Sequence, residues 1–109
     1  MPRTLSAVAA LGLSLLAADP VSAANIQAGR QKIAGLCQAC HGMDGLSKNP
    51  ESPNLAGQLE NYLVKALREY RSGERKNESM NIVAKELTDE EIANVAAFYA
   101  AIQVDVIPP

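Results

Sequence analysis

The chain has 109 residues, a formal net charge of −2 and 20% charged residues. This length allows one domain, and the slight acidity argues against nucleic-acid binding and against a polybasic membrane patch. Aromatic residues are scarce, with three Tyr, one Phe and no Trp. A short chain with so few aromatics builds only a thin core, so we expect another source of apolar bulk.

Residues 1–23 have the three parts of a secretory signal peptide. Arg3 lies in the n-region, an apolar h-region runs from about residue 5 to residue 18, and Asp19-Pro20 breaks it. Val21-Ser22-Ala23 then offers small residues at the −3 and −1 positions. We expect cleavage after Ala23, with cleavage after Ala24 as the alternative. Residues 24–109 would then form one domain exported to the periplasm.

An uncleaved membrane anchor is the competing interpretation of this leader. Its apolar run is about fourteen residues, or roughly 21 Å as a helix, against a hydrocarbon core of about 30 Å. The run is too short to span comfortably, so we expect no stable membrane insertion after cleavage.

The mature chain opens with a segment, residues 25–36, that we expect to be helical. Asn25 is a suitable N-cap, and Ile26, Gly29 and Ile33 follow helical spacing. A glycine inside a helix costs about 1 kcal/mol relative to alanine. Close approach of a second helix would explain Gly29, and simple tolerance in a short helix is the alternative.

The most informative stretch is Cys37-Gln38-Ala39-Cys40-His41, which has the spacing of a c-type haem attachment site. One helical turn presents both sulfurs to the two vinyl groups of a porphyrin, and the next residue turns its ring nitrogen to the iron. A thioredoxin-like pair would need a βαβ pattern, which is not evident. A structural zinc site needs four ligands, and His41 is the only histidine. We therefore favour one covalent haem c, which also supplies the missing apolar bulk.

Two irregular stretches alternate with two further helices. Residues 42–57 are rich in Gly and Pro and are expected to form a loop that covers a ligand. Residues 58–71 carry an apolar stripe at helical spacing, followed by Gly73 at a C-cap position. Residues 74–87 are expected to be irregular. Thr88 and Glu91 make a capping box, which begins a last helix that runs to Ile102.

Residues 25–103 resemble class I cytochrome c, and within it the small bacterial c4/c5-like and c553-like domains. The resemblance implies an all-α fold of three main helices and loops wrapped around one haem. It also places Gly29 where the first and last helices cross, opposite Val95 and Phe98. The stretches that carry it are Ala28-Gly29-Arg30, Cys37-Gln38-Ala39-Cys40-His41-Gly42, Pro53-Asn54-Leu55-Ala56-Gly57-Gln58, Gly73-Glu74-Arg75 ahead of Met80, and Leu87-Thr88-Asp89-Glu90-Glu91-Ile92.

The resemblance assigns roles at the haem. Cys37 and Cys40 correspond to the thioether attachments, and His41 corresponds to the proximal iron ligand. Pro53 resembles the proline whose carbonyl accepts a hydrogen bond from the proximal imidazole. Met80 corresponds to the distal ligand.

Elimination also favours Met80 as the sixth ligand. Met1 leaves with the signal peptide, and Met43 is tethered near His41 on the proximal side of the ring. The alternative is that Met80 is a packing methionine and that the iron is five-coordinate.

The leading hypothesis is a monomeric periplasmic carrier that is not an enzyme and passes one electron at a time to transient redox partners. A haem subunit of a dehydrogenase or oxidase complex is one alternative. A haem enzyme or gas sensor with an open sixth site is another. Four basic residues of the segments expected to flank the haem are candidates for a docking ring, although we favour ordinary solvated side chains: Lys48, Arg75, Lys76 and Lys85.

Overall fold

The structure, a computed structural model, describes residues 1–14 and 23–109. These residues form five α-helices and no strand: α1 (Ile26–Leu36), α2 (Gln38–His41), α3 (Glu60–Ser72), α4 (Glu78–Lys85) and α5 (Asp89–Ala101). The all-α fold expected from the sequence is confirmed. The expected signal peptide falls partly on residues 15–22, outside the described residues. No helix of the described part has the length and apolar character needed to cross a membrane.

Helices α1 and α5 cross with their backbones in direct contact. A Cβ atom built on the buried Gly29 would lie 2.6 Å from the carbonyl carbon of Asn94 and 3.2 Å from the amide nitrogen of Val95. The backbone nitrogen of Asn25, the N-cap of α1, donates a hydrogen bond to Oδ1 of Asn94 at 2.7 Å. The sequence-based explanation of Gly29 as a point of close helix approach is thus confirmed.

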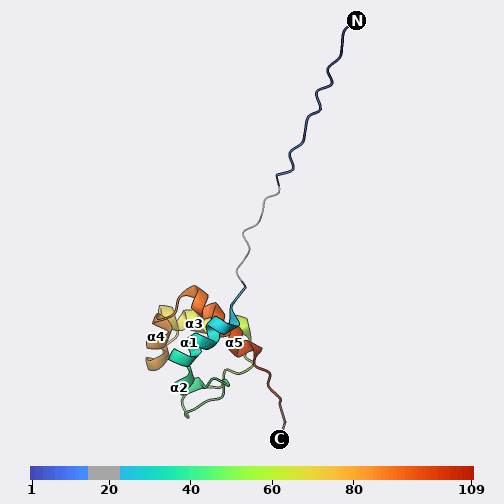
Figure 1. Ribbon diagram of the computed structural model, residues 1–109. Coiled ribbons are helices and arrows are strands. Elements are labelled where there is room, and N and C mark those ends of the chain that lie inside the picture. Colours follow the sequence, from blue (N-terminus) through green and yellow to red (C-terminus); the bar gives the residue numbers. More distant parts are fainter. Residues whose placement is uncertain (15–22) are drawn as a thin grey trace.

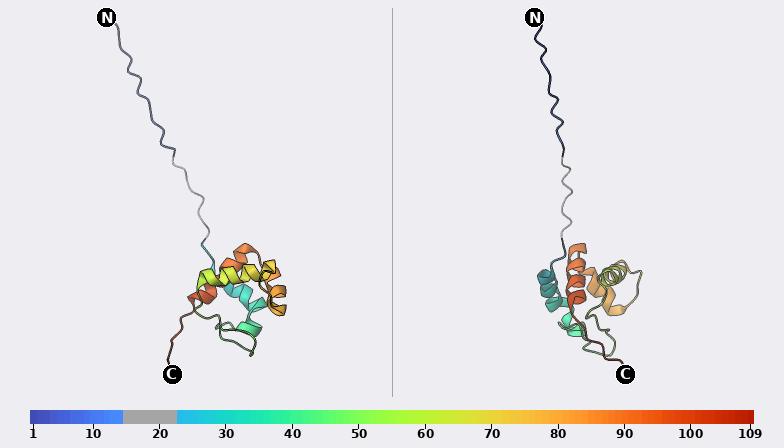
Figure 2. Two further views of the ribbon diagram at one scale, coloured as in Figure 1. Left: turned by 180° about the vertical axis from the view of Figure 1, so that it is seen from behind. Right: turned by 90° about the vertical axis from the view of Figure 1, so that its right-hand side faces the viewer.

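The core lies where α1, α3 and α5 meet. Its buried cluster comprises Ile33, Leu63, Val95, Ala96 and Tyr99. Phe98, the other residue expected near the crossing, is partly buried and packs against this cluster. Figure 2 shows α2 and the loop that follows it gathered at one end of the domain, with α3 toward the other. Figure 1 shows α1 leading directly into α2.

The helix ends follow the signals in the sequence. Gly73 ends α3 in the left-handed conformation, with φ of 83°, which glycine adopts without strain. The capping box of Thr88 and Glu91 is complete at the start of α5. Helix α3 begins at Glu60, two residues later than the stripe suggested.

The expectation of an irregular stretch over residues 74–87 is wrong, because α4 forms within it. Asn77, in extended conformation, accepts hydrogen bonds from the amide nitrogens of Ser79 at 3.1 Å and Met80 at 2.9 Å. An eight-residue helix is too short to be stable alone and depends on tertiary packing. Here α4 packs against α3 and buries Ala84. A segment this short shows no long apolar period in the sequence, and its contact with α3 is a tertiary feature.

The helix crossing can be tested with two glycines of the same helix. Gly29→Ala should lower the free energy of unfolding by about 2 kcal/mol or more, because the new methyl group meets backbone atoms of α5 that cannot rotate away. Gly35→Ala is the matched control. A Cβ at Gly35 meets no atom within 4 Å, so this variant should raise the free energy of unfolding by up to about 1 kcal/mol. Denaturant unfolding of both holoproteins measures the difference, and equal effects would contradict the crossing.

Candidate haem-binding site

A single helical turn positions the two thiols and the imidazole. The amide nitrogen of Cys37 continues α1 by donating to the carbonyl oxygen of Ile33 at 2.9 Å. The carbonyl oxygen of Cys37 then accepts from the amide nitrogens of Cys40 at 3.3 Å and His41 at 3.0 Å. Cys37 is half-buried against the core, whereas Cys40 is exposed. The sequence motif therefore has the local geometry that its spacing predicts.

Burial raises the pKa of the free Cys37 thiol to about 11, against a smaller opposing effect of Lys32. Burial therefore disfavours the thiolate form of Cys37, which is the form that disulfide exchange requires. Among the residues that the structure describes, no group of three or more His, Cys, Asp and Glu side chains is placed to hold a metal ion.

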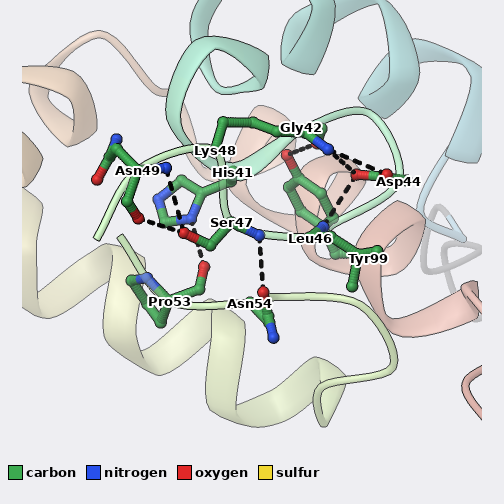
Figure 3. A network of polar contacts seen from close by, with 10 residues as sticks. All are labelled: His41, Gly42, Asp44, Leu46, Ser47, Lys48, Asn49, Pro53, Asn54 and Tyr99. Carbon is green, nitrogen blue, oxygen red and sulfur yellow. Dashed lines mark hydrogen bonds and ion pairs between the residues drawn. The ribbon is translucent and has the colours of Figure 1, made fainter. Parts of the chain in front are cut away.

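His41 is buried, and its ring is oriented by one hydrogen bond. Nδ1 lies 2.8 Å from the carbonyl oxygen of Pro53, as Figure 3 shows. A carbonyl oxygen can only accept, so Nδ1 carries a proton and donates it to Pro53, which leaves Nε2 as the ring nitrogen that could bind a metal. An imidazole oriented in this way, beside two thiols on one turn, is a donor set that fits a covalently attached haem.

The loop of residues 42–57 has both ends fastened to Tyr99 of α5. The Tyr99 hydroxyl donates to the carbonyl oxygen of Gly42 at 2.9 Å, in a buried contact that Figure 3 shows. The carbonyl oxygen of Tyr99 accepts from the amide nitrogen of Gly57 at 2.9 Å. Burial raises the pKa of Tyr99 well above its usual range, so the hydroxyl remains a donor. The loop that carries Pro53 is thus held at its start and at its end.

Sequence reasoning missed this role of Tyr99. One signal was available. A tyrosine at a core position of a helix carries a hydroxyl that needs a hydrogen-bond partner when it is buried, whereas phenylalanine does not. The identity of the partner, 57 residues earlier in the chain, could not be read from the sequence.

Further hydrogen bonds hold the interior of the loop. The side chain of Asn54 accepts from the amide nitrogen of Ser47 at 2.7 Å, which links the start of the loop to the stretch beside Pro53. Asp44 accepts from the amide of Leu46 at 3.0 Å and pairs with Lys48 at 3.1 Å, and these two contacts lower the pKa of its carboxyl group.

The two methionines of the described domain occupy different surroundings. Met43 is half-buried and packs against the core cluster. Met80 is half-buried in the first turn of α4, where Asn77 caps its amide nitrogen. Met80 lies outside the hydrogen-bond network that joins His41 to Pro53. The structure therefore brings together Cys37, Cys40, His41 and Pro53 through α2 and its loop, and places Met80 on a separate element.

The four basic residues proposed as a docking ring differ in their contacts. Lys48 is paired with Asp44. The guanidinium carbon of Arg75 lies 4.7 Å from the ring centroid of Tyr70, and its Nη1 donates to the Tyr62 hydroxyl at 3.2 Å. Lys76 and Lys85 are exposed. Two of the four are thus engaged within the protein, which favours the interpretation as ordinary surface cations over a ring of free charges.

Comparison with known proteins defines the class. Residues 26–102 match the family model described as cytochrome c. Cytochrome c-554(548) of Halomonas halodenitrificans is 44% identical over 82 residues, which are 72% of this chain and 98% of that protein. The chain therefore belongs to the cytochrome c family, whose members are electron-transfer proteins with a covalently bound haem c. The expected haem is confirmed, and Cys37 and Cys40 fit its attachment motif.

Two further relatives match a larger share of this chain but less of their own length. The crystal structure of reduced recombinant cytochrome c4 from Pseudomonas stutzeri has a TM-score of 0.69 and 35% identity, and the match covers 77% of this chain and 48% of that one. A thiosulfate dehydrogenase electron acceptor of Thiomonas intermedia is 37% identical over 93% of this chain and 45% of its own length. Several other curated relatives, cytochrome c4 proteins among them, are covered over 28% to 49% of their length.

The energetic role of Tyr99 can be tested by removing one oxygen. Tyr99→Phe should lower the free energy of unfolding by about 1–2 kcal/mol, because the buried carbonyl of Gly42 loses its donor. Tyr62→Phe is the control. Its hydroxyl lies on a side chain that is 44% exposed, so the change should stay within about 0.5 kcal/mol. Equal losses in denaturant unfolding of the two holoproteins would contradict a fastening role for Tyr99.

Proposed function

We propose that this chain is a periplasmic carrier that holds a single covalent haem c and passes one electron at a time. One observation carries the proposal. His41 lies on the same helical turn as two thiols, and the carbonyl oxygen of Pro53 orients its ring. When bound, haem c supplies a one-electron ferric–ferrous couple. The chain's own residues then have to hold the group, set its potential and keep water and other ligands away from it.

On the proximal side, Cys37 and Cys40 would form the thioether links and Nε2 of His41 would bind the iron. The carbonyl of Pro53 fixes the ring's tautomer and direction and makes it a better ligand. Because the acceptor is a main-chain oxygen, this contact depends on where the loop holds residue 53 and not on the proline side chain. Tyr99 supports it by holding the two ends of the loop.

On the distal side, Met80 is the proposed sixth ligand. A thioether favours ferrous iron, which raises the reduction potential, and a filled sixth position keeps oxygen and peroxide from the iron. Met43 packs against the core and stays close to His41 in sequence, which supports the assignment to Met80. Four large apolar side chains of α4, of the start of α3 and of the loop are exposed and are available to cover a porphyrin: Ile82, Leu59, Tyr62 and Leu46.

A carrier needs no side chain that donates or accepts protons beside the residues that hold the haem. His41 is the only histidine of the chain, and its Nδ1 is engaged with Pro53. We therefore propose that the protein is not an enzyme. Residues 1–23 would direct export and be removed after Ala23, and mass spectrometry of the exported holoprotein should give a chain that begins at Ala24.

The partners are proposed to be other redox proteins that dock transiently at the haem edge of a monomer. The similarity to a thiosulfate dehydrogenase electron acceptor supports a second candidate, in which the chain serves as the haem subunit of a dehydrogenase complex. Both candidates use the same site. Co-purification of the chain with a dehydrogenase from native extract, at fixed stoichiometry and in high salt, would favour the permanent complex over the shuttle.

Replacing Met80 tests the closed site. Met80→Ala should make cyanide bind to the ferric holoprotein at once and should create peroxidase-like activity, because the sixth position is then open. Met43→Leu is the matched control, and it should leave cyanide binding as slow as in the parent. Rapid cyanide binding by the parent protein would contradict the proposal, as would a Met80→Ala variant that behaves like the parent.

The reduction potential gives an independent test. A thioether ligand and an apolar shell both disfavour the extra charge of ferric haem, so we expect a positive potential and a one-electron Nernst slope. Spectroelectrochemical titration of the purified holoprotein measures both quantities. A strongly negative potential would contradict His/Met ligation.

A further inference from the structure

Asn81 follows Met80 in the sequence, and both the nitrogen and the oxygen of its side-chain amide form hydrogen bonds within the protein. Its Nδ2 donates to the carbonyl oxygens of Tyr70 at 2.9 Å and Arg75 at 2.8 Å. Its Oδ1 accepts from the backbone nitrogen of Asn77 at 2.8 Å. One half-buried amide thus joins the last turn of α3, the turn that follows, and the first residue before α4.

Asn77 and Asn81 hold each other in a reciprocal arrangement. The side chain of Asn77 accepts from the amide nitrogen of Met80 at 2.9 Å, while the backbone nitrogen of Asn77 donates to the side chain of Asn81. The carbonyl oxygen of Asn77 accepts from the amide nitrogen of Asn81 at 2.9 Å. The amide nitrogen of Met80 is therefore capped by Asn77, and Asn77 is bonded in turn to Asn81.

The turn between α3 and α4 is itself fixed on α3. The amide nitrogen of Arg75 donates to the carbonyl oxygen of Glu69 at 3.1 Å, and its guanidinium lies over the ring of Tyr70. The carbonyl groups that Asn81 contacts are therefore held in place, and the hydrogen bonds of Asn81 tie the first turn of α4 to them.

We propose that Asn81 is a positioning residue that holds Met80 on the iron, which rests on the proposed role of Met80 as the sixth ligand. Helix α4 has only eight residues, and helices of this length are not stable without tertiary contacts. Without the amide of Asn81, the first turn of α4 frays more often. Met80 then spends a larger fraction of time away from the iron, and an external ligand finds the sixth position open more often.

Asn81→Asp tests this role with little change of shape. The carboxylate keeps the acceptor for Asn77 but places an oxygen against the two carbonyl groups that now receive a donor. The helix dipole favours a negative charge in the first turn, so the added charge itself should not loosen α4. Any loosening of α4 in this variant is therefore caused by the loss of the two donors. If Asn81→Asp does not fold, Asn81→Ala removes the same donors without adding a charge.

The readout is the affinity of the ferric holoprotein for imidazole, because apparent affinity scales with the fraction of protein whose sixth position is open. Asn81→Asp should raise this affinity by about tenfold, as expected from the loss of two hydrogen bonds. Hydrogen exchange should also speed up at the amides of Met80 and Asn81 while those of α5 stay protected. Thr88→Ala removes the N-cap of α5, costs a similar amount of stability and lies outside the contacts of the haem motif, so it should leave imidazole affinity within about twofold of the parent.

The outcomes separate this proposal from the assignment of Met80. If Met80→Ala raises imidazole affinity and Asn81→Asp leaves it within about twofold of the parent, Asn81 has no positioning role and Met80 remains the ligand. If Thr88→Ala raises the affinity as much as Asn81→Asp does, the effect is general destabilisation and the proposal is wrong. If Met80→Ala itself changes nothing, Met80 is not the ligand and both proposals fail.

Discussion

The backbone contact between α1 and α5 at Gly29 is the constraint on which the rest of the site depends. No side chain separates the two helices there, so their relative position is set by main-chain atoms. Helix α1 continues into the turn that bears Cys37, Cys40 and His41, and α5 bears Tyr99. The crossing therefore fixes the distance between the haem motif and the residue that fastens the loop behind it. The contact between Pro53 and His41 is thus supported by helix packing elsewhere in the domain.

The two sides of the site are held in different ways. The proximal side has a motif within one helical turn, a loop fastened at both ends, and a ring oriented by a main-chain carbonyl. The proposed distal ligand, Met80, lies on an eight-residue helix whose start is hydrogen-bonded to the amide of Asn81. If both proposals hold, loosening of the first turn of α4 would open the site on the side of Met80 and leave His41 in place.

Local features of the site were predictable from the sequence, whereas long-range contacts were not. The attachment motif, the N-cap at Asn25, the capping box at Thr88 and the C-cap at Gly73 each depend on a few neighbouring residues. Gly29 was interpretable because a glycine inside a helix calls for a reason. Helix α4 was missed because it is short and depends on α3. The partner of Tyr99, the engagement of Arg75 and the three bonds of Asn81 depend on tertiary structure, which a single sequence does not display.

The central claim is that His41 and Met80 close both axial positions of one haem. The optical spectrum of the oxidised and reduced holoprotein tests it most directly. We expect a low-spin haem c in both states and, in the oxidised protein, the weak charge-transfer band between methionine sulfur and ferric iron. An oxidised spectrum without that band, or a high-spin spectrum typical of a five-coordinate iron, would contradict the claim.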